Sequence, residues 1–136
     1  MPRHESKELS KHSQYYISRD HYLELYYFCR QYYDWKSEYD SLCNVKAIDY
    51  DEHIKSTDVS DQTGDTAVKR KLLSDKMKLV DKALIETDKE LATFIFKNVV
   101  SGESYKYLSS HYTVPCCEKT FYSYRRRFFW LLAKDR

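Results

Sequence analysis

Glycine and proline are scarce in this chain, with two residues of each among 136. All-β sandwiches and barrels need many tight turns, which depend largely on these two residue types. A glycine-rich phosphate-binding loop is excluded for the same reason. Apolar residues instead recur at helical spacing along much of the chain. The sequence therefore predicts an all-α fold.

The first helical pattern covers residues 19–42 and is rich in aromatic side chains. Its apolar positions follow one another in alternating steps of three and four residues, which is the period of an amphipathic helix. We interpret this segment as a helical arm that packs on the rest of the protein. A stripe this wide also suits self-association. The candidate residues for such a seam are Leu25, Phe28, Tyr32, Trp35 and Tyr39.

Two polar segments flank this arm. Residues 1–18 lack the apolar centre of a secretory signal and are expected to form a flexible N-terminus. Residues 43–64 are acidic and poor in large apolar groups, so they are predicted to be a linker. The longest apolar runs are only a few residues long, so no membrane-spanning segment is expected. A cytoplasmic location follows from these expectations.

Residues 65–136 show the pattern of a central helix followed by three further helices. The central helix is expected to end near Glu86. Thr87–Glu90, with the sequence TDKE, has the form of a capping box that would begin the next helix. Gly102 is well placed as the left-handed end of that helix, and Ser104 can cap a short helix after it.

A last helix is expected from about Cys117 to Ala133, after a break at Pro115. The order of a helix, a glycine turn, a short helix and a longer basic helix is that of a trihelical helix-turn-helix domain. We therefore predict that residues 65–136 consist of a central helix and a C-terminal domain of this type.

The last helix contains the sequence TFYSYRRRFFW, in which three arginines stand together. At about 100° per residue, one side is apolar. This predicted buried side comprises Phe121, Tyr124, Phe128, Leu131 and Leu132. The opposite side comprises Lys119, Tyr122, Ser123, Arg126 and Trp130, with Arg127 at its margin. Arg125 lies close to the apolar side, so its stem is expected to pack while its head reaches the rim.

The C-terminal part is the basic end of the chain, because residues 101–136 hold seven basic and three acidic side chains, a net charge of +4. Lysine and arginine can donate to phosphates or guanine edges, and hydroxyl groups can bond to either. The candidate nucleic-acid-binding residues are Lys106, Lys119, Thr120, Tyr122, Ser123, Arg126 and Arg127. The alternative is that Arg125–Arg127 is a solvated basic face.

The segment VVSGESYKYLSSHYTVPCCEKTFYSYRRRFFWLLAK resembles the C-terminal helix-turn-helix of small transcriptional regulators from phages and prophages of Gram-positive bacteria. These are the RinA-like and ArpU-like proteins, which are similar to region 4 of sigma factors. By position, Gly102 matches the turn after the first helix, Leu108 the apolar position of the second, and Phe121 that of the recognition helix. The resemblance implies sequence-specific binding to double-stranded DNA that switches on late phage genes, in the cytoplasm of a bacterial host.

Other functions remain as alternatives. Catalysis is not expected, because the carboxylates and histidines show no arrangement with a nucleophile or oxyanion motif. The four cysteines lack the paired spacing of a zinc site, so neither a metal nor another cofactor is expected. A helical protein-interaction module, or a phage DNA-packaging component without a regulatory role, is the main alternative to a regulator. Host RNA polymerase and a second copy of the chain are further candidate partners.

Overall fold

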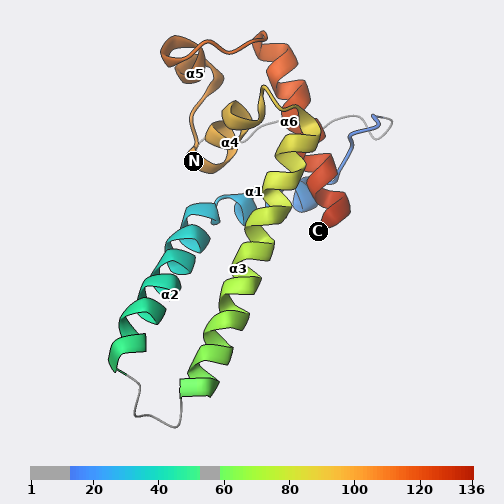
Figure 1. The fold of residues 1–136 in the computed structure, drawn as a ribbon. Coiled ribbons are helices and arrows are strands. Elements are labelled where there is room, and N and C mark those ends of the chain that lie inside the picture. Colours follow the sequence, from blue (N-terminus) through green and yellow to red (C-terminus); the bar gives the residue numbers. More distant parts are fainter. Residues whose placement is uncertain (1–12, 53–58) are drawn as a thin grey trace. The chain divides into compact units, whose positions relative to one another are not determined.

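The computed structural model of the protein describes residues 13–52 and 59–136, with side chains described for residues 13–43 and 64–136. Every regular element in these ranges is a helix, which confirms the predicted all-α class (Figure 1). The helices are α1 (Arg19–Cys29), α2 (Tyr32–Glu52), α3 (Val59–Thr87), α4 (Ala92–Ser101), α5 (Tyr105–His111) and α6 (Glu118–Asp135). None of these described helices combines the length and apolarity needed to cross a membrane.

The helical arm predicted for residues 19–42 is interrupted, and the prediction of one continuous pattern is wrong at this point. Helix α1 ends at Cys29 and α2 begins at Tyr32. Arg30 keeps right-handed helical dihedral angles, with φ −63° and ψ −15°, so the apolar spacing runs across the break almost unchanged. Its guanidinium donates a hydrogen bond of 3.1 Å to the carbonyl oxygen of Val100, which is a tertiary contact that no local pattern reveals.

The segment predicted as an acidic linker is largely helical in the described residues. Helix α2 continues through residues 43–52, and α3 already includes residues 59–64. Extending an existing helix adds one hydrogen bond for each residue fixed and does not require burial of a side chain. Residues 53–58 of this segment, and residues 1–12 of the predicted N-terminus, lie outside the described part.

The chain divides into two compact units, and α3 contributes to both of them. One unit consists of Gln31–Lys78, and the other consists of the residues up to Arg30 together with Leu79–Arg136. In the first unit, α2 and the early part of α3 lie side by side and run in opposite directions (Figure 1). Trp35 is buried there, with the Lys76 ammonium 5.7 Å from the centre of its ring.

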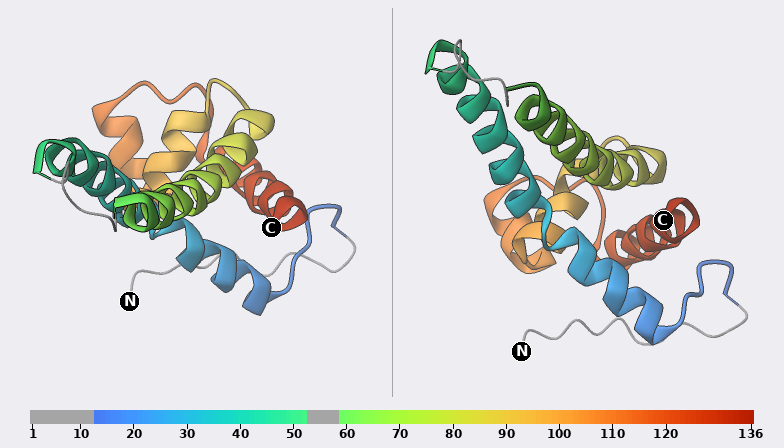
Figure 2. Two further views of the ribbon diagram at one scale, coloured as in Figure 1. Left: turned by 60° about the horizontal axis from the view of Figure 1, so that its bottom comes forward. Right: turned by 90° about the horizontal axis from the view of Figure 1, so that it is seen from below.

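The second unit contains the main core. Helix α1 packs along α6 and also contacts α4, although these helices are far apart in sequence (Figures 1 and 2). The Tyr22 and Phe129 rings meet edge to face with their centres 4.9 Å apart. The largest fully buried side chains of this unit are Leu25, Cys29, Val80, Ile95, Val99, Leu108, Phe121, Phe128, Phe129 and Leu132.

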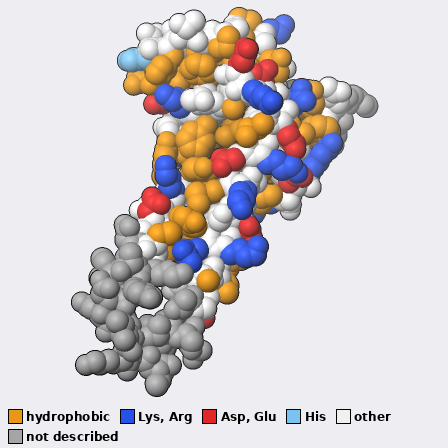
Figure 3. Space-filling view, viewed as in Figure 1, with side chains coloured by type: hydrophobic (Ala, Val, Ile, Leu, Met, Phe, Trp, Pro, Cys, Tyr) orange, Lys and Arg blue, Asp and Glu red, His pale blue; other side chains and the backbone are white. Residues whose placement is uncertain are grey.

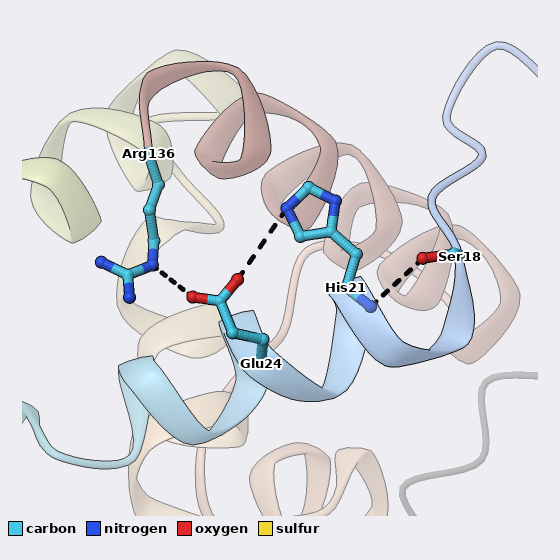
Figure 4. A network of polar contacts seen from close by, with 4 residues as sticks. All are labelled: Ser18, His21, Glu24 and Arg136. Atoms are coloured by element: carbon cyan, nitrogen blue, oxygen red, sulfur yellow. Dashed lines mark hydrogen bonds and ion pairs between the residues drawn. The ribbon is translucent and has the colours of Figure 1, made fainter.

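Polar contacts fasten the end of α6 to α1. Arg136 Nε donates a hydrogen bond of 2.7 Å to Glu24 Oε1, and the Arg136 guanidinium lies 3.8 Å from the centre of the Phe28 ring. His21 Nε2 is 4.0 Å from the other oxygen of Glu24, and the Ser18 hydroxyl caps α1 by accepting from the backbone N–H of His21 (Figure 4). The Arg136 contacts therefore join the end of α6 to α1, whereas the Ser18 cap and the His21–Glu24 contact lie within α1.

The ends of α4 and α5 test three predicted caps. Gly102 ends α4 with a φ of +75°, and Ser104 caps α5 by accepting from the N–H of Tyr107, as predicted. The predicted capping box is wrong, because Thr87 is the last residue of α3 and its hydroxyl donates to the carbonyl of Ala83. Asp88 Oδ1 instead accepts from the backbone N–H groups of Glu90 and Leu91, at 2.8 and 3.0 Å.

Candidate nucleic-acid interface

Helix α5 and the chain after it are held by one buried leucine and one tyrosine. Leu108 is fully buried, whereas most other residues of α5 are exposed. The Tyr105 hydroxyl donates a hydrogen bond of 2.6 Å to the carbonyl of Cys116, and its ring lies 5.6 Å from that of Phe121. Burial raises the pKa of Tyr105, so this hydroxyl stays protonated and able to donate. These contacts set the path of residues 112–117 between α5 and α6.

The buried side of α6 is rotated relative to the prediction. Phe121, Phe128 and Leu132 are buried as expected, whereas Tyr124 and Leu131 are only half-buried. Phe129 is almost completely buried and was not placed on this side by the sequence. At about 100° per residue it lies some 80° from Phe121, at the edge of the apolar sector. Helix α1 packs against that edge through Tyr22, which moves the buried side toward Phe129.

Arg125 is the largest departure from the predicted face of α6. Its side chain is only 7% exposed, although its head was expected at the rim. Nε donates a hydrogen bond of 2.8 Å to Asn98 Oδ1, and the guanidinium lies 5.6 and 5.1 Å from the ring centres of Tyr22 and Phe129. Arg125 therefore joins α1, α4 and α6, and it is not part of the outer basic surface.

The predicted contact residues occupy the outer side of α6 and one position on α5. Lys106, Lys119, Thr120 and Ser123 are exposed, and Tyr122, Arg126 and Arg127 are half-buried. Arg125 is thus more buried than Arg126 and Arg127, and the early part of α6 has an exposed lysine, threonine and serine. We call Lys119, Thr120, Tyr122, Ser123 and Arg126 the outer face of α6.

Two residues of this region are less accessible than the sequence suggested. Arg126 Nε is buried and has no hydrogen-bond partner among the described residues. Arg127 Nη2 donates a long hydrogen bond of 3.5 Å to the carbonyl of Glu86. Trp130, which was predicted to lie outside, is half-buried, because the Tyr15 ring is 5.4 Å and the Lys134 ammonium 3.4 Å from its ring centre. Among the predicted contact residues of α6, the exposed ones therefore lie in its first two turns.

The five residues predicted to form a self-association seam do not share one open surface. Leu25, Phe28 and Trp35 are 0%, 4% and 4% exposed, because they are packed inside the two units. Tyr32 and Tyr39 are half-buried. Three of the five side chains are therefore not accessible to a second copy of the chain.

The thiols near the start of α6 differ in acidity. A hydrogen bond with the Thr120 hydroxyl, 3.2 Å away, lowers the pKa of Cys117, which is the exposed N-cap of α6. Burial raises the pKa of Cys116, and it raises that of Cys29 to about 12. Within residues 13–52 and 59–136, no group of three or more histidine, cysteine or carboxylate side chains is arranged to hold a metal ion.

The chain was compared with protein-family models, curated proteins and solved structures. No protein-family model, curated protein or solved structure matches this chain.

Proposed function

We propose that the protein binds double-stranded DNA through the outer face of α6, as a sequence-specific transcriptional regulator. The observation that supports this most directly is the composition of the exposed first turns of α6. Lys119, Thr120 and Ser123 are exposed on a helix whose other side is anchored by buried phenylalanines. A helix fits the major groove, where ammonium and hydroxyl groups can bond to base edges and phosphates.

The helix is rigidly supported, which is a requirement for reading base edges. Phe121 and Phe128 are 0% and 1% exposed, and Arg125 ties the same helix to α4 and α1. Lys106 on α5 supplies a second exposed cation for the DNA backbone. In this arrangement Lys119 and Ser123 are the leading base contacts, and Tyr122, Arg127 and Lys106 contact phosphates. Arg126 is a less favourable base contact than its sequence position suggested, because its Nε is buried.

A phage or prophage origin and control of late genes belong to the same proposal. Their support is the sequence resemblance of residues 94–136, together with the Gly102 helix end and the Ser104 cap found at the expected positions. Host RNA polymerase is the expected protein partner of such a regulator.

The test is binding to phage and bacterial genomic fragments at several salt concentrations, with an unrelated duplex as competitor. Each neutralised phosphate should contribute about 0.9 to the slope of log affinity against log salt. Lys119→Ala should weaken binding to the selected fragment, by about 1–3 kcal/mol if the lysine reads a base. Lys71→Ala removes another exposed lysine charge, on α3, and serves as the control. Equal, weak binding to all fragments, or equal affinities of the two variants, would exclude the proposal.

A protein-interaction module, which includes a packaging component that acts through protein contacts, is the second candidate. The observation that favours it is a pair of exposed apolar residues one helical turn apart on α3, Val68 and Leu72, which are 59% and 57% exposed. Such spacing suits a contact with another helix. If the module is the function, Leu72→Asp abolishes co-sedimentation with the partner, and Lys119→Ala leaves it unchanged.

A further inference from the structure

Helix α5 exposes a stacked pair of aromatic rings on the side that flanks its buried residue, Leu108. The Tyr107 and His111 rings are stacked, with their centres 4.0 Å apart and their planes 23° from parallel. Tyr107 is 44% exposed and His111 is also exposed, whereas Leu108 of the same helix is fully buried. Side chains four residues apart meet on a helix, so the two rings form a preformed stack at the surface.

Hydrogen bonds fix the orientation of this stack. His111 Nδ1 lies 3.0 Å from the carbonyl oxygen of Tyr107 and 3.1 Å from the Ser110 hydroxyl. The Ser110 hydroxyl also donates a hydrogen bond of 2.9 Å to the carbonyl oxygen of Tyr107. Rings that are already ordered lose less conformational freedom when a ligand stacks on them.

A third exposed ring follows the stack in the chain, and two lysines lie beside these aromatic residues, one in space and one in sequence. Tyr112 follows His111 directly and is 43% exposed, and the Lys97 ammonium lies 3.9 Å from the centre of its ring. Lys106 is exposed beside Tyr107 in the chain. Residues 104–117 contain no aspartate or glutamate, so no carboxylate of this segment opposes an anionic ligand. Hydrophobic side chains reach the surface around α5 (Figure 3).

We propose that this surface, formed by Lys97, Lys106, Tyr107, His111 and Tyr112, binds single-stranded nucleic acid. Unpaired bases stack on exposed aromatic rings irrespective of sequence, and nearby lysines neutralise the phosphates between them. The bases of a duplex are already stacked on one another, so this surface selects unpaired strands. The inference goes beyond the proposed duplex contact of α6 and does not depend on it.

The test uses fluorescence anisotropy of the full chain with labelled oligothymidylate and oligouridylate of about 16 nucleotides. An abasic oligonucleotide of the same length is the reference for purely electrostatic binding. The wild-type chain should bind at least one of the base-containing strands more tightly than the abasic strand, and the tighter of the two identifies DNA or RNA. Equal affinity for the base-containing and abasic strands, or no binding, would overturn the proposal.

Matched variants locate the surface. Tyr107→Leu keeps the apolar bulk and removes the ring, and it should weaken binding to the base-containing strand by about 5- to 150-fold. Tyr27→Leu is the control, because Tyr27 is 46% exposed on α1. Equal effects of both variants would overturn the assignment to α5. Thermal melts monitored by circular dichroism check that both variants are folded, and Tyr112→Leu replaces Tyr107→Leu if the latter is not.

Duplex binding distinguishes this proposal from the function of α6. Tyr107→Leu should leave affinity for a duplex unchanged, whereas Lys119→Ala should reduce it and leave binding to the single strand intact. The two proposals can therefore fail separately.

Discussion

The three consecutive arginines of α6 have different roles because their burial differs. Arg125 is 7% exposed and contacts an amide oxygen and two aromatic rings, whereas the hydrogen bond described for Arg127 is a long one of 3.5 Å to a backbone carbonyl. The hydrogen bond described for Arg125 is made to the side-chain amide of Asn98, which carries no charge. Its contribution to stability should therefore come from packing of its stem and from the ring contacts, more than from charge pairing.

This difference predicts the order of stabilities of arginine variants. Arg125→Ala should lower the free energy of unfolding by about 2–4 kcal/mol, since it leaves a cavity and an unpaired amide oxygen. Arg125→Met fills most of the space and should cost less than about 1.5 kcal/mol. Arg127→Ala, the control, should cost less than about 1 kcal/mol. Urea denaturation measures all three, and equal costs for the two alanine variants would contradict the argument.

The cysteines should react at different rates, in the order of their thiolate populations. The Thr120 hydroxyl stabilises the thiolate of Cys117 and lowers its pKa, and Cys117 is exposed. Cys29 is buried, with its pKa raised to about 12. Because the thiolate is the nucleophile, iodoacetamide should modify Cys117 first and Cys29 last, as measured by peptide mass spectrometry.

Replacing Thr120 by valine isolates the hydroxyl from the shape of the side chain. Without this hydrogen bond the pKa of Cys117 should rise, so alkylation near neutral pH should slow. The rate of the variant should approach that of the wild type only at higher pH, where both thiols are deprotonated. Ser109→Ala removes an exposed hydroxyl that bonds to the carbonyl of Lys106 and should have no effect. An unchanged pH profile for Thr120→Val would show that the hydrogen bond does not control the acidity.

At the scale of helices, the two glycines of the chain should respond in opposite directions to the same substitution. Gly102 has a φ of +75°, and an added Cβ would lie 3.0 Å from Arg30 Nη1. Gly102→Ala should therefore lower the free energy of unfolding by about 1–2 kcal/mol. Gly64 lies inside α3 with open space around it, so Gly64→Ala should raise the free energy of unfolding by about 0.5–1 kcal/mol. Urea denaturation tests both variants, and the same sign for both would contradict the assigned conformations.

The outcome at helix ends shows what local sequence could predict. Gly102 and Ser104 were located correctly because a left-handed residue and an N-cap are selected by local backbone geometry. The TDKE sequence also matches a local rule, yet Asp88 accepts the free N–H groups and α3 extends to Thr87. Thr87 and Asp88 are adjacent and both belong to residue types that cap helices, so the local rule alone does not choose between them.

The candidate site was predicted in part for a similar reason. Periodicity placed Lys119 and Ser123 on the exposed side of α6. It could not reveal that α1 covers one edge of the helix, because that contact joins residues more than a hundred positions apart, as between Glu24 and Arg136. The burial of three residues of α6 differs from the prediction, and each of them contacts an aromatic residue that precedes Arg30. These residues are Phe129, Arg125 and Trp130. The outer aromatic surface of α5 was not predicted, since a seven-residue helix gives little periodic signal.

At the scale of the molecule, the compact unit that contains α6 is discontinuous in sequence. It combines the residues up to Arg30 with Leu79–Arg136, whereas the sequence analysis grouped residues 65–136 as a central helix and a C-terminal domain. Helix α1 supplies Tyr22, Leu25, Phe28 and Cys29 to the core, and none of them is more than 9% exposed. Burial of a large apolar side chain contributes about 1.5–3 kcal/mol. Removing α1 should therefore cost a free energy close to the whole free energy of unfolding of a small domain.

A fragment of residues 65–136 should therefore fold poorly on its own. Circular dichroism should show low helicity and no cooperative thermal transition, and addition of a peptide of residues 13–30 should restore both. The same peptide with Leu25→Asp should fail, because it would place a charge at a fully buried position. A fragment that melts cooperatively at the temperature of the full chain would show that α1 is dispensable. The outer face of α6 would then be presented by a domain that begins near residue 65, and the loss of α1 should leave DNA binding unchanged.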